Sequence, residues 1–156
     1  MALHLKVSNG VNGESEQGQH KKWIDLESVH WGASQPAAIR GGGVAAGVGQ
    51  FHDLTCVAKI DCAYPDLLQK CADGTHFDSV ELNAVKAGGS NLIYLKICMY
   101  EVLVTSVDIN GSSGQDVMVS YSFQGAKLTT AYTPQTKTGG AGAAITKTWD
   151  IKQQNK

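Results

Sequence analysis

The sequence predicts a mainly antiparallel β fold with a single helix, and three observations support this fold class. Polar and apolar residues alternate strictly in several short segments, as they do in strands that bury one face. Turn-forming stretches such as NGVNG (9–13) and NGSSG (110–114) separate these segments. One further segment carries the end signals of a short helix. At 156 residues the chain is predicted to form one domain, residues 1–156.

Regular alternation predicts half-buried strands in four segments. Their apolar residues are Leu3, Leu5 and Val7; Leu54, Cys56, Ala58 and Ile60; Val80, Leu82 and Ala84; and Val117, Val119, Tyr121 and Phe123. A weaker pattern predicts a last strand near the C-terminus, at Ile145, Trp149 and Ile151.

The segment WIDLESVHW (23–31) departs from strict alternation. Its inward face runs through Ile24 and Leu26 and then shifts by one residue to Val29 and Trp31. An extra residue near positions 27 and 28 would produce this shift, so we predict a β-bulge there.

The segment NLIYLKICMYEVLVTSV (91–107) is apolar on both faces. The odd positions from Ile93 to Met99 are apolar, yet the even positions also include apolar or aromatic residues. Because a half-exposed strand should have one wet face, the second face is expected to meet a helix or another chain. The candidate residues for a subunit interface on this strand are Tyr94, Tyr100, Val102 and Val104.

The stretch YPDLLQKCADG (64–74) predicts the helix. Pro65 suits a first helical position, Asp66 favours the N-terminal end of the helix dipole, and Gly74 suits the C-terminal cap. The predicted apolar face consists of Leu67, Leu68, Cys71 and Ala72. So short a helix can cover only part of the second apolar face of residues 91–107. Because the rest of that face would stay exposed, we expect self-association.

The stretch IRGGGVAAGVGQF (39–51) resembles a phosphate-binding loop at first sight. Gly41-x-Gly43-x-x-Ala46 satisfies the dinucleotide fingerprint, but the following FHDLTCVAKI alternates as a strand where a helix is required. We therefore predict a flexible or interface loop over residues 32–50, because structureless loops of this length are usually functional or disordered. Its candidate contact residues are Arg40, Gly41, Gly42, Gly43, Gly47 and Gly49.

Composition argues against several function classes. The formal net charge is −1 and the 13 basic residues are scattered, so nucleic acid is not an expected partner. No apolar run approaches the roughly 18 to 20 residues that span a bilayer, so membrane insertion is not expected. The start MALHLKVSNG lacks the features of a cleaved signal peptide. Charged residues make up only 17%, which suits a protein that hides its surface against partners or any glycine-rich β protein.

No metal, cofactor or catalytic site is predicted. The four cysteines form no CxxC pair, and the five histidines are dispersed along the chain, so strand or loop positions explain the histidines better than metal ligation does. GxSxG and HExxH motifs are absent, although catalytic groups can converge from distant strands. The chain is therefore expected not to be an enzyme.

Several short motifs, taken in order, resemble the haemolysin-coregulated protein (Hcp) family, the tube subunit of the bacterial type VI secretion system. They cover nearly the whole chain: GES (13–15), HWGASQ (30–35), the glycine-rich loop with Asp53 and Leu54, Lys59 with Asp61, Pro65 with Leu67, KAGG (86–89), EVLVTSV (101–107) and YTPQ (132–135).

The resemblance implies a compact antiparallel β-barrel of two sheets with one flanking helix. It further implies homohexameric rings that stack into a hollow tube, with no enzyme activity and no cofactor. The implied partners are other copies, a tip spike protein, a contractile sheath and effector proteins carried in the ring lumen. Assembly would occur in the bacterial cytoplasm, followed by secretion or delivery into target cells. The alternatives are a monomeric barrel that binds a small apolar ligand and an enzyme without a recognisable motif.

By motif position, His30 is the candidate lumen residue that touches effectors, and the glycine-rich loop is a candidate contact between subunits or rings. Two positions depart from the family pattern. Tyr64 stands where Ser or Thr would cap the helix, and Gly125 stands where a large apolar residue is usual. Because the sequence stops soon after its last predicted strand, no C-terminal effector extension is expected.

Overall fold

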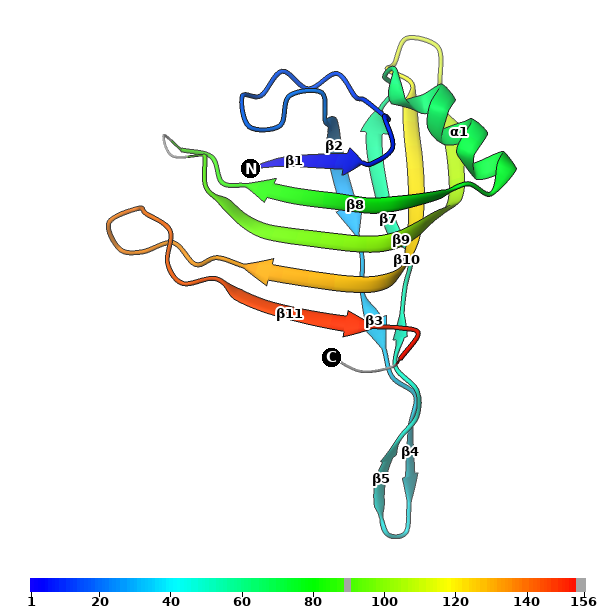
Figure 1. Ribbon diagram of the computed structural model, residues 1–156, viewed down its shortest axis with the longest axis vertical. Helices are drawn as coiled ribbons and strands as arrows, with labels where there is room; N and C mark the ends of the chain where they lie inside the picture. The colour runs from blue at the N-terminus through cyan, green and yellow to red at the C-terminus, as the bar shows by residue number, and fades with distance from the viewer. Residues whose placement is uncertain (89–90, 154–156) are drawn as a thin grey trace.

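Antiparallel strands close into a barrel in the computed structural model, which describes residues 1–88 and 91–153 (Figure 1). Within these residues the closed order is β10-β7-β2-β1-β8-β9, with β9 pairing back to β10, and β11 extends the sheet beyond β10. The strands are β1 Ala2–Val7, β2 Ile24–His30, β7 Leu54–Lys59, β8 His76–Val85, β9 Ile93–Asn110, β10 Met118–Tyr132 and β11 Ile145–Asp150; the helix α1 is Ala63–Asp73. The predicted mainly β fold with a barrel and one helix is confirmed.

The two long strands β9 and β10 belong to both layers of the barrel. The first half of β10 pairs with β7, from Met118 opposite Lys59 to Phe123 opposite Leu54. Its second half pairs with β11, from Lys127 opposite Asp150 to Tyr132 opposite Ile145. Strand β9 follows the other edge of β10 along nearly its whole length, and both strands bend between the layers (Figure 1). The two sheet layers are therefore joined without a break.

Strand β9 changes its inward face at Glu101, and this corrects one prediction. Ile97 and Met99 are buried before this point, and Val102 and Val104 are buried after it, with exposed fractions of 0% and 3%. Glu101 has a φ of 53°, a left-handed conformation that interrupts the alternation of the strand. The strand is apolar on both faces because one face points into the core before Glu101 and the other face points into the same core after it. Val102 and Val104 cannot contact another subunit, so their assignment to an interface was wrong.

Strand β2 contains the predicted bulge. Its register against β7 shifts between Leu26 and Ser28. Ile24 and Leu26 are buried before the shift, and Val29 and Trp31 pack against the core after it. The shift leaves the side chain of His30 exposed.

The helix begins earlier than predicted. Ala63 is its first residue, so Pro65 is the third, where its missing N–H is still outside the intrahelical ladder. The Asp61 carboxylate accepts a hydrogen bond from the Ala63 N–H at 3.0 Å, so the end is capped although Tyr64 is not a capping residue. Gly74 caps the other end as predicted, with a φ of 71°. Leu67 is buried, whereas Leu68 is exposed, so the predicted apolar face is only partly buried.

Gly125 fits a close approach of β10 to β9. A Cβ at this position would lie 3.0 Å from the Cβ of Met99 and 3.2 Å from the carbonyl oxygen of Tyr100. A large apolar side chain would collide with both, so the departure from the family pattern suits this barrel.

The segment expected to be a loop is an ordered arm. Strands β4 (Ala37–Arg40) and β5 (Gly43–Ala46) form a hairpin, and β3 (Ala33–Ser34) pairs with β6 (Gln50–Phe51) at its base. Two glycines separate β4 from β5, which suits a tight two-residue hairpin turn. The pairing segments are too short to show a clear period in the sequence.

Replacing Gly13 by Ala is expected to destabilise the fold. The added Cβ would lie 2.4 Å from the carbonyl oxygen of Trp23, and backbone cannot move away as easily as a flexible side chain. We expect the free energy of unfolding to fall by about 1–3 kcal/mol in urea denaturation. Gly18→Ala is the matched control, because its Cβ would meet no atom within 4 Å. Equal midpoints for the two variants would contradict this account.

Candidate functional site

The arm, residues 33–51, projects from the barrel (Figure 1), and it carries exposed apolar side chains. Ile39 and Val44 are directly opposed across the hairpin and are 85% and 73% exposed. Val48 is 55% exposed nearer the base. A two-stranded ribbon is only marginally stable in water, and exposed apolar side chains gathered on it are typical of a protein contact. The arm is therefore the candidate functional site.

For two of the arm glycines, the structure of the single subunit already accounts for the absence of a side chain. Gly43 has a φ of 132°, a conformation that side chains rarely adopt. A Cβ on Gly47 would lie 2.8 Å from Cγ of Pro36, whose carbonyl oxygen accepts a hydrogen bond from the Gly47 N–H at 2.8 Å. Gly41, Gly42 and Gly49 have open space around them. The side chain of Arg40 lies outside the described part of the structure.

A polar cluster anchors the base of the arm to two barrel strands. The Gln124 amide on β10 donates to the Phe51 carbonyl oxygen at 3.1 Å and to Asp53 Oδ1 at 3.2 Å. The Thr105 hydroxyl on β9 donates to Asp53 Oδ2 at 2.8 Å. These bonds fix the direction in which the arm leaves the barrel. Sequence reasoning missed Gln124 and Thr105, because nothing local connects them to the arm.

An aromatic cluster lies beside this anchor. The ring of Phe51 stacks with Trp31 at 5.8 Å between centroids and meets Trp149 at 6.5 Å. The three residues line a groove of about 280 Å³ together with residues of β10 and β11. Trp31, predicted to pack in the core, packs against the core and also lines this groove.

His30 lies on a different surface, the outer face of the layer formed by β2, β7 and the adjoining halves of β10 and β9. It is directly opposite Thr55, which is opposite Ser122, which is opposite Ser106. The hydroxyls of Thr55 and Ser122 are 3.2 Å apart. This row presents one exposed imidazole beside short polar side chains, and the arm residues are not part of it.

The other two interface candidates lie on β9. Tyr100 is 40% exposed, and Tyr94 is half-buried with its hydroxyl 2.6 Å from the Met1 sulfur. The structure therefore leaves Tyr100 as the more accessible of the two for a partner.

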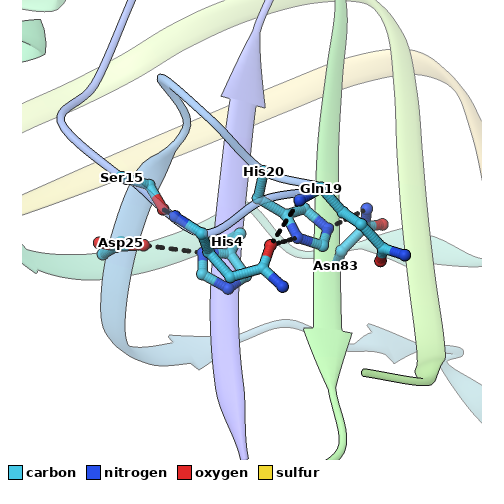
Figure 2. Close-up of polar contacts among 7 residues, drawn as sticks. His4, Ser15, Gln19, His20, Asp25 and Asn83 are labelled. Atoms are coloured by element: carbon cyan, nitrogen blue, oxygen red, sulfur yellow. Dashed lines mark hydrogen bonds and ion pairs between the residues drawn. The ribbon is translucent and has the colours of Figure 1, made fainter. Parts of the chain in front are cut away.

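Two histidines that are separate in the sequence meet in the structure (Figure 2). The rings of His4 and His20 stack at 4.4 Å, and both residues are buried. Asp25 and Asn83 contact the pair through hydrogen bonds. Sequence reasoning treated these histidines as isolated, because nothing in their spacing indicates that His20 lies beside His4 of β1.

Within residues 1–88 and 91–153, no group of three or more His, Cys, Asp or Glu side chains is placed to hold a metal ion. In the same residues, no helix is both long and apolar enough to span a membrane.

Comparison with known proteins gives one consistent result. The family model "Type VI secretion system effector, Hcp" matches residues 4–132. Protein hcp1 from Pseudomonas aeruginosa is 35% identical over 160 residues, which cover 98% of each chain. A solved structure of a type six secretion system protein has a TM-score of 0.93 at 26% identity, covering 99% of this chain and 98% of that one. Hcp1 from Salmonella typhimurium has a TM-score of 0.81 at 26% identity, covering 99% and 97%.

Replacing Gln124 by Leu is expected to loosen the arm. The change leaves the Phe51 carbonyl and one Asp53 oxygen without their amide donor, which typically costs about 1–3 kcal/mol. Urea denaturation should show this loss, and amide hydrogen exchange should rise in residues 33–51.

The matched control is Gln135→Leu, because the Gln135 amide also donates to a backbone carbonyl, that of Gly139, but at an exposed site. Its free energy of unfolding should change by no more than about 0.5 kcal/mol. Unchanged exchange in the arm of the Gln124 variant would show that this residue does not anchor it.

Proposed function

Because the chain belongs to the Hcp family of type VI secretion tube proteins, we propose that it forms homohexameric rings that stack into a hollow tube. Tube and effector proteins held in the ring lumen would be exported together. The observation that carries this proposal is the apolar arm, which projects from a barrel whose own core is already complete. The family is a structural one, not a family of enzymes.

The arm is the proposed contact between stacked rings. It extends beyond the barrel, so it can reach a neighbouring ring when barrels lie side by side in one ring (Figure 1). Its tip pairs Ile39 with Val44, and small alanines flank this pair. Burying the two exposed side chains would remove apolar surface from water, while small neighbours permit close approach. Few charges would have to be desolvated in such a contact.

The row from His30 to Ser106 is the proposed lumen wall. Thr55, Ser122 and Ser106 place three short hydroxyl side chains next to His30 in this row. Such a wall suits proteins that must be carried and then released, and His30 offers a larger side chain for contact. Tyr100 remains a candidate for the contact between neighbouring subunits of one ring.

The remaining parts of the proposal follow from family membership. The spike protein at the tube tip, the contractile sheath and the effectors are the proposed partners. Rings would form in the bacterial cytoplasm and leave with the tube. A monomeric ligand-binding barrel fits less well, because Phe77, Tyr121 and Phe123 are fully buried inside.

Replacing both Ile39 and Val44 by Asp is expected to prevent stacking while rings persist. The change puts two charges where the proposed contact buries apolar surface. Light scattering should still report rings, whereas electron microscopy should show tubes at least several-fold shorter, and less protein should reach the culture medium.

Leu68→Asp is the matched control, since Leu68 is an exposed apolar residue on α1, outside the arm. Its tubes should keep their normal length. Normal tubes in the double variant would refute the stacking role of the arm, and loss of rings would assign the arm to the contact within a ring.

Replacing His30 by Glu is expected to change how much effector purifies with the ring, because it alters the charge of the proposed lumen wall. The measurement is the molar ratio of bound effector to subunit after size-exclusion chromatography. His76→Glu, at an exposed histidine on β8, should retain the normal ratio. An unaltered ratio in the His30 variant would remove this residue from the lumen surface.

A further inference from the structure

We propose that the stacked pair His4 and His20 is an acid-sensitive latch. It holds the connector between β1 and β2, residues 8–23, against the barrel and releases it when His20 takes up a proton. The latch is a property of the single subunit, so it does not depend on the proposed tube function.

The geometry joins the connector to the barrel through one aromatic stack. His4 belongs to β1 and His20 to the connector, and their rings are nearly parallel, with an angle of 10° and 4.4 Å between centroids. Trp23, at the end of the connector, packs edge-on against His20 at 4.6 Å. The exposed fractions of His4 and His20 are 4% and 0%. A charge on either ring would therefore lie away from water.

With the Asn83 amide in this orientation, the hydrogen bonds of His20 fit a neutral ring. The Asn83 amide nitrogen can only donate, so the Nε2 atom of His20, 3.1 Å away, accepts. The proton of the neutral ring then sits on Nδ1, which donates to Gln17 Oε1. A second proton on Nε2 would face the Asn83 N–H group, so the Asn83 contact would be lost in this arrangement.

His4 has a hydrogen-bond partner at only one of its ring nitrogens. Its Nδ1 atom is 2.7 Å from Asp25 Oδ1, while its Nε2 atom is buried without a hydrogen-bond partner. A proton on Nε2 would leave an unpaired N–H in the interior. It would also place a positive charge directly against the neighbouring imidazole ring.

The surrounding charges do not reverse this preference. Asp25 on β2 and Glu81 on β8 favour the charged form of His20, but burial and His4 outweigh them and lower its pKa. Glu81 is itself paired with Lys96 on β9 at 3.1 Å. Lys6 on β1 lies over the Trp23 ring at 5.9 Å and adds positive charge nearby.

The sign of the pH effect follows from the lowered pKa of His20. Near its ordinary pKa of about 6.5 the unfolded or released segment binds more protons than the latched one. The stabilisation is therefore complete above this pH and is lost as the pH falls through the lower value of the latched state. Each unit by which the pKa is lowered corresponds to about a tenfold change in the latching equilibrium.

The connector is built to move as a unit. Its middle pairs with its C-terminal end through the bonds Gly13 N–H to Lys22 O at 2.8 Å and Ser15 N–H to Trp23 O at 2.9 Å. Besides the histidine stack, the connector begins with a hydrogen bond from the Ser8 N–H to the Ser79 carbonyl oxygen on β8 at 3.0 Å. Its Val11 side chain is buried, and Asn12 accepts a hydrogen bond from Cys62 at the start of α1. Losing the stack would thus free the part of the connector around His20, while Ser8, Val11 and Asn12 hold its first part and the barrel strands keep their pairing.

The test is amide hydrogen exchange of the whole protein between pH 7.5 and pH 5.0, corrected for the intrinsic pH dependence of exchange. Protection of residues 11–23 should fall severalfold below about pH 6.5, while β7 and β10 stay protected. The Cε1 proton resonance of His20 should titrate over the same pH range. Constant protection of the connector across this range would overturn the proposal.

Two variants separate the latch from ordinary acid damage. Asn83→Asp replaces the donor by a carboxylate that can accept a proton-bearing Nε2, so connector protection should persist to lower pH. His76→Gln removes an exposed histidine and should retain the wild-type pH profile. An acid transition that Asn83→Asp leaves in place, or that His76→Gln abolishes, would show that His20 is not the sensing group.

Discussion

Closure of the barrel through the β9–β10 pairing is the constraint on which the other features depend. Each strand must serve two layers, so β9 has to present apolar residues inward both before and after Glu101. The left-handed conformation of Glu101 makes that change of phase, and Gly125 provides the close approach on the facing strand. With the pairing closed, each strand in the barrel order has a hydrogen-bonded neighbour on both sides, so most strand edges are already used within the subunit.

The arm is the part of the subunit that leaves large apolar side chains exposed to water. The barrel buries large side chains such as Tyr121 and Phe123, whereas the arm holds Ile39 and Val44 in water. Its base is nevertheless firmly placed, because Gln124 and Asp53 tie it to the same two long strands that close the barrel. A rigid base with an uncovered apolar tip is what a protein–protein contact requires, and this agrees with membership of a tube-forming family.

The histidine stack shows a second use of the closed barrel. Strands β1 and β8 place His4 and Asn83 side by side, and the connector supplies His20 between them. The stack joins a long, mostly irregular segment to the sheet through groups whose charge depends on pH. The proposed latch thereby couples the stability of this region to pH.

Local features were predictable from the sequence alone. Alternation located the strands, the shift after Leu26 located the bulge, and Gly74 marked the end of the helix, because each depends only on neighbouring residues. Val102 and Val104 were misplaced because apolar and aromatic residues occupy both faces of that segment, which hides the change of phase at Glu101. The arm anchor at Gln124 and the pairing of His4 with His20 were also invisible. They join residues distant in the sequence, and only the register of the closed sheet decides which side chains face one another.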